Sequence, residues 1–104
     1  MTKQQARKAA DFLDAVALSV MSGWGQGEFW DLDNQPCCVV GHRIIVREES
    51  RVSDDVATIA RDAMEAAAGT PLLERWNDAL NRTQDDVIKL CHRAAYSLRH
   101  GGQL

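Results

Sequence analysis

The side chains best suited to covalent chemistry in this sequence are a cysteine and a histidine four residues apart, Cys38 and His42. If residues 36–49 form a helix, both side chains lie on one face, and the helix N-terminus lowers the pKa of a thiol in its first turn. His42, or His92 from the last part of the chain, would then act as the base, and Asn77 or Asp78 would orient the imidazole. This pattern gives one hypothesis, a small thiol-dependent enzyme. The plainer interpretation is that the cysteine is a small buried apolar residue and that His42 is a surface side chain.

The same two residues could also contribute to a metal site, because side chains four residues apart on a helix can hold one ion. A complete tetrahedral site would need Cys37 and Cys91 to approach Cys38 and His42 through the fold. The sequence has no C-x-x-C or H-x-x-x-H spacing. A metal-binding helical domain is therefore kept as an alternative, and we predict neither a metal site nor a cofactor.

A glycine-rich segment at residues 23–35 holds half of the six aromatic residues of the chain, Trp24, Phe29 and Trp30. Three glycines in five residues cannot continue a helix. Because a solvated linker would not carry so many aromatic side chains, we expect a loop packed against the body. In a structural role, Trp24 packs on a helix end and the Gln26 amide satisfies backbone groups. In a functional role, Phe29 and Trp30 anchor a partner.

A second polar cluster is formed by Trp76, Asn77 and Asp78, followed by Arg82. We expect Trp76 to be a core aromatic residue and its two neighbours to hydrogen-bond backbone groups in a turn. Arg82 is positioned to pair with Asp78. If these residues border the glycine-rich loop, they would contribute to a binding site instead.

We expect helices to position these residues, because the sequence contains helix-capping residues and apolar residues at helical spacing. The first helix is expected between the cap Thr2 and Gly23, another between Ser53 and Gly69, and the last begins at Thr83. Each threonine is followed three residues later by Gln or Asp, as in a capping box. Apolar residues recur at helical spacing in all three segments, and a short helical turn is expected between the last two.

The remaining segment, residues 36–49, is ambiguous. Its β-branched residues favour a short strand at 38–47. A helix is favoured if Asp33 or Asn34 caps it and Pro36 lies in its first turn. With either outcome we predict an all-α fold, a compact bundle of four to five helices with a long Gly/Trp-rich loop.

The composition of the chain argues against several classes of function. The chain has 104 residues, 45% of them hydrophobic, and a formal net charge of −3, as expected for one helical domain over 1–104. The acidic balance argues against a nucleic-acid binder. No apolar run of membrane-spanning length and no signal-peptide pattern occurs, so we expect no membrane association. Three cysteines, two of them adjacent, are a poor disulfide framework and predict a cytoplasmic protein.

Three short motifs occur in order: W-x-Q-G at 24–27, C-x-x-G at 38–41, and W-N-D at 76–78, with R-T at 82–83. This order resembles a family of small uncharacterised proteins from actinobacteria and their phages, over roughly residues 24–95. In that family the C-x-x-G stretch is usually an Ala-rich helix, so the resemblance favours a helix there, although this chain has β-branched residues instead. The resemblance implies no activity.

No complete catalytic or metal signature is present, and the loop is rich in aromatic residues. We therefore predict a small cytoplasmic protein that acts through protein–protein interaction, with a bacterial host protein as partner if the gene belongs to a phage. The alternatives are the thiol enzyme and the metal-binding domain, and exposed apolar helix faces could also form a homodimer. The predicted binding residues are Trp24, Gln26, Phe29, Trp30, Trp76, Asn77, Asp78 and Arg82.

Overall fold

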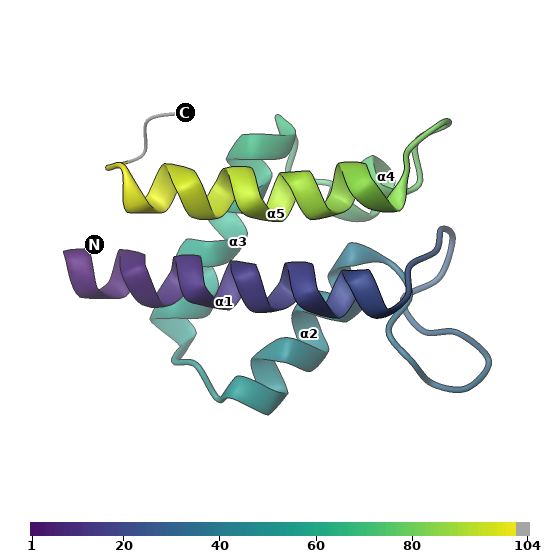
Figure 1. The fold of residues 1–104 in the computed structure, drawn as a ribbon, viewed down its shortest axis with the longest axis horizontal. Helices are drawn as coiled ribbons and strands as arrows, with labels where there is room; N and C mark the ends of the chain where they lie inside the picture. Colours follow the sequence, from purple (N-terminus) through teal and green to yellow (C-terminus); the bar gives the residue numbers. More distant parts are fainter. Residues whose placement is uncertain (102–104) are drawn as a thin grey trace.

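The computed structural model describes residues 1–101, which contain five helices (Figure 1). They are α1 Lys3–Ser22, α2 Val39–Ser50, α3 Asp54–Ala68, α4 Leu73–Asn77 and α5 Gln84–Arg99. Within these residues the only β-type pairing is an isolated bridge between Trp30 and Pro36. The predicted all-α bundle is therefore confirmed. None of its helices is long and apolar enough to cross a bilayer.

The predicted helix caps are present. Thr2 and Gln5 form a capping box at the start of α1, and Thr83 and Asp86 form another at the start of α5. The Ser53 side chain accepts a hydrogen bond from a backbone N–H in the first turn of α3. These contacts satisfy N–H groups that have no partner inside the helix, and so they fix where each helix begins.

The helix favoured for residues 36–49 is confirmed and the alternative strand at 38–47 is absent from this segment, but the helix does not begin near Pro36 as predicted. The helix α2 begins at Val39, with Cys38 as its N-cap residue. The preceding backbone is held extended by the loop: the N–H of Cys37 donates to the Phe29 carbonyl at 2.8 Å, and the N–H of Cys38 donates to that of Glu28 at 3.1 Å. Because of these tertiary contacts with the loop, the helix begins at Val39 and not near Pro36. Local propensity alone does not predict such contacts.

The core lies where α1, α3 and α5 meet. Figure 1 shows α1 and α5 side by side and antiparallel, with α3 crossing behind them. The apolar stripes predicted for the first and last helices face inward. Their buried members are Ala9, Leu13, Val16, Ala17, Val20, Val87, Leu90, Cys91, Ala94 and Leu98. Away from the loops, Arg99 of α5 forms ion pairs with Asp11 and Asp14 of α1.

Both long connections lie at one end of the bundle. Figure 1 shows the segment between α1 and α2 and the segment between α4 and α5 at the same end, where α1 finishes and α5 begins. Gln84 joins these helices there, because its side-chain amide donates to the Val20 carbonyl at 2.7 Å. The glycine-rich loop and the W-N-D motif are therefore neighbours.

Candidate functional site

Asn77 joins three separate parts of the chain. Its side chain is fully buried. The Asn77 Oδ1 accepts hydrogen bonds from the Trp24 indole N–H at 2.7 Å and from the Val39 backbone N–H at 3.0 Å. Its Nδ2 donates to the Gly25 carbonyl and to the Asp78 carboxylate, both at 3.0 Å. One amide thus ties the loop to α2 and α4.

Gln26 and Asp78 complete the attachment of the loop. The Gln26 side chain donates to the backbone carbonyls of Asn77 and Ala79, both at 3.0 Å. In return, the Asp78 carboxylate accepts from the Gly27 N–H at 2.9 Å. Gly27 has a φ of +85°, a left-handed conformation that a side chain would strain. Gln26 bonds backbone groups as expected, whereas the side chains of Asn77 and Asp78 bond backbone groups of the loop and not of the predicted turn. Together these contacts fix the base of the loop.

Trp76 and Arg82 lie beside this attachment, and Arg82 contacts Trp76 in place of the predicted Asp78. Arg82 does not pair with Asp78. Its Nε donates to the Trp76 carbonyl at 2.9 Å, and its guanidinium carbon lies 3.9 Å from the centre of the Trp76 ring. The half-buried indole offers the face of its π system to the cation, a favourable arrangement.

The far part of the loop exposes its apolar side chains. We call residues 29–32 the loop tip. Phe29 is 45% exposed, Trp30 37% and Leu32 100%. Trp24, in contrast, packs against the core. Of the aromatic residues of the loop, Trp24 therefore attaches it to the core, whereas Phe29 and Trp30 are exposed.

The backbone of the loop tip is ordered by its own hydrogen bonds. The Asp31 carboxylate accepts from the N–H groups of Asp33 at 2.8 Å and Gln35 at 2.9 Å. The Asp31 N–H donates to the Gln35 carbonyl at 2.9 Å. Because its backbone is already arranged, the loop tip would lose little conformational freedom on binding.

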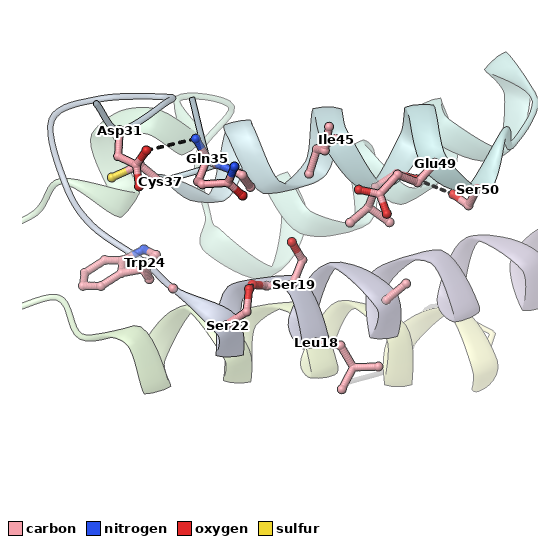
Figure 2. Close-up of a pocket in the computed structure, with 14 residues that line it drawn as sticks. Leu18, Ser19, Ser22, Trp24, Asp31, Gln35, Cys37, Ile45, Glu49 and Ser50 are labelled. Carbon is pink, nitrogen blue, oxygen red and sulfur yellow. Dashed lines mark hydrogen bonds between the residues drawn. The ribbon is translucent and has the colours of Figure 1, made fainter. Parts of the chain in front are cut away.

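A cleft of about 910 Å³ opens beside the loop, between α1 and α2 (Figure 2). Its apolar lining is Ala15, Leu18, Trp24, Pro36, Ile45 and Val46. Its polar lining includes Ser19, Ser22, Gln35, Cys37 and Ser50, and its charged side chains are Asp31 and Glu49. In Figure 2, Trp24 and Asp31 mark the loop end of the cleft, and Glu49 marks the other end.

Cys38 and His42 do not form the expected catalytic pair. Cys38 is 2% exposed, and burial raises the pKa of its thiol despite the nearby N–H groups of α2. The His42 Nε2 lies 2.6 Å from the Gly23 carbonyl oxygen, so it must carry a proton and donate. The other predicted base, His92, is exposed on α5.

His42 is buried, so its interpretation as a surface side chain is wrong. Burial lowers the pKa of the imidazole, which favours the neutral form. In that form, with the proton on Nε2, Nδ1 accepts from the Ser19 hydroxyl at 2.6 Å. His42 thereby ties α2 to the end of α1. Nothing in the sequence marked Ser19 as its partner, because the two residues are 23 positions apart.

Within residues 1–101, no three His, Cys, Asp or Glu side chains are close enough to hold one ion. Cys91 lies in the core, where burial raises the pKa of its thiol to about 12. The thiolate that a metal requires is therefore strongly disfavoured at this position.

Comparison with known proteins identifies a family but no activity. No curated protein and no solved structure matches the chain. The profile of a family of unknown function, DUF6197, matches residues 2–97, which include the loop, the W-N-D motif and all five helices except the end of α5. The chain therefore belongs to the DUF6197 family.

Proposed function

We propose that the protein binds another protein through the loop tip. The observation that carries this proposal is the contrast between the fixed base of the loop and its exposed end. The base is held by Asn77, Gln26 and Asp78, whereas Phe29, Trp30 and Leu32 remain accessible. Large aromatic side chains on an ordered backbone are suited to anchoring an interface, because they bury much area at a small entropic cost.

Further exposed apolar side chains lie at the same end of the bundle as the loop tip. Leu18 and Met21, on the last two turns of α1, are 67% and 59% exposed, and Leu80, in the connection before α5, is 92% exposed. Both segments belong to the end of the bundle that carries the loops (Figure 1). A cluster of exposed apolar side chains at one end is a typical feature of an interaction surface.

Features of the sequence support a proposed partner and a proposed compartment. The motif order resembles proteins of actinobacteria and their phages, so we propose a bacterial host protein as the partner of a phage-borne copy. The net charge of −3 favours a protein over a nucleic acid. We propose a cytoplasmic setting, because Cys37, Cys38 and Cys91 are free thiols.

Site-specific photocrosslinking in the cells that make the protein tests the proposal. Benzoylphenylalanine in place of Leu32 is expected to give one discrete adduct with a different protein. The same probe in place of Tyr96, which is 53% exposed on α5, is the matched control and should give none. Trp30→Ala should reduce the Leu32 adduct at least about fivefold.

Two results would overturn the proposal. The first is an equal yield of adducts from the two positions. The second is a Leu32 adduct of twice the mass of the chain, which would show that the loop tip contacts a second copy and that the protein is a homodimer.

A further inference from the structure

The charged side chains that line the cleft beside the loop tip are both acidic. Asp31 and Glu49 are its charged lining residues, and Lys and Arg are missing from its walls as the structure describes them. Glu49 forms no ion pair, and neither does Asp31, among the pairs found in residues 1–101. Glu49 is therefore available to a cationic group from outside, and Asp31 offers the carboxylate oxygen that its two backbone hydrogen bonds do not use.

The two carboxylates stand at opposite ends of an apolar floor. Asp31 belongs to the loop, and Glu49 lies one helical turn beyond Ile45 on α2 (Figure 2). Ile45 of α2 lies between these ends, and Ala15 of α1 lines the same cleft. The cleft thus presents a negative charge, an apolar stretch and a second negative charge in succession.

We infer that the cleft receives a basic segment of the protein partner, in which an apolar side chain lies between two Lys or Arg residues. The inference rests on the proposed interaction at the loop tip and names the chemistry of what enters beside it. The apolar side chain lies against Ala15 and Ile45, and the flanking cations lie near Asp31 and Glu49. Complementary charge at the rim fixes the register of the segment and raises its rate of association.

Selection of peptides tests this directly. The probe is a library of random dodecapeptides displayed on phage and selected on the full-length protein. Enriched peptides are expected to be basic, with Lys or Arg on both sides of a Leu, Ile, Val, Met or aromatic residue. Binding of a selected synthetic peptide, measured by fluorescence anisotropy, should weaken as salt is added.

Substitutions of the two carboxylates locate the site. Glu49→Lys should weaken a selected basic peptide about tenfold, since it replaces attraction by repulsion. Glu48→Lys is the matched control, because it makes the same charge change on the same helix outside the lining of the cleft. Asp31→Asn removes charge and keeps an oxygen that can accept from Asp33 and Gln35, so the loop should stay folded.

The outcomes separate this inference from the proposed function. Enrichment of acidic or uncharged peptides, failure to enrich any peptide, or equal effects of Glu48→Lys and Glu49→Lys would each overturn the inference. Crosslinking at Leu32 reports on the loop tip and does not depend on these results. If it succeeds while the peptides fail, the partner binds the loop tip and leaves the cleft empty.

Discussion

At the scale of single residues, the polar contacts of Asn77 hold the candidate site together. Asn77→Ala would leave the Trp24 indole N–H, the Val39 N–H and the Gly25 carbonyl without their partner. Buried groups that lose a hydrogen bond destabilise a protein strongly. We expect the free energy of unfolding to fall by about 3 kcal/mol.

Urea denaturation measures this loss. Gln4→Ala, at an exposed position of α1, is the control and should change the free energy of unfolding by less than about 0.5 kcal/mol. If Asn77→Ala behaved like that control, Asn77 would not be the residue that fixes the loop.

His42 makes stability depend on pH. Burial lowers the pKa of its imidazole in the folded protein, so the unfolded chain binds the proton more tightly. The stability that His42 contributes is complete above its unfolded pKa of about 6.5 and is lost as the pH falls from there toward the folded pKa. Within that window the loss approaches about 1.4 kcal/mol for each pH unit.

Urea denaturation at a series of pH values between about 7.5 and 5 measures this dependence. His42→Gln should reduce the difference between the two ends of the series. His92→Gln should preserve it, because His92 is exposed. Equal pH profiles for the wild type and His42→Gln would contradict the assignment.

At the scale of elements, the position of the loop depends on its approach to α2. A Cβ built on Gly41 would lie 2.2 Å from the Phe29 carbonyl oxygen, well inside van der Waals contact. Because that oxygen belongs to the backbone, Gly41→Ala must push the loop away from the helix. We expect a loss of at least about 2 kcal/mol in the free energy of unfolding, and weaker crosslinking at Leu32.

Gly23→Ala is the matched control for this substitution. A Cβ there meets no atom within 4 Å, and the backbone is extended, with a φ of 167°. Its effect should stay within about 0.5 kcal/mol by urea denaturation. Similar losses for the two variants would show that the loop does not depend on contact with α2.

The elements also show where reasoning from sequence succeeds. Thr2, Ser53 and Thr83 cap their helices as predicted, because capping involves residues only three positions apart. The segment before α2 was misjudged for the opposite reason. Its backbone bonds to Glu28 and Phe29, about ten positions away, and no local pattern encodes that pairing.

At the scale of the whole molecule, the fold brings together residues that are distant in the chain. The W-x-Q-G and W-N-D motifs meet at one end of the bundle through the contacts of Trp24 and Gln26 with Asn77, across more than 50 positions. The sequence showed that both motifs carry polar and aromatic side chains suited to contact. Their pairing requires α1 and α5 to pack antiparallel, which sets both motifs at the same end (Figure 1).

The amino-acid sequence by itself determined the all-α class, the capped starts of three helices and the apolar stripes. These features depend on helical periodicity and on contacts between near neighbours. Only the tertiary structure decided that Cys38 and His42 are buried, that Phe29 and Trp30 are exposed, and that a cleft with Asp31 and Glu49 lies beside them. Burial and proximity depend on how the helices pack, and that packing is set by the whole chain at once.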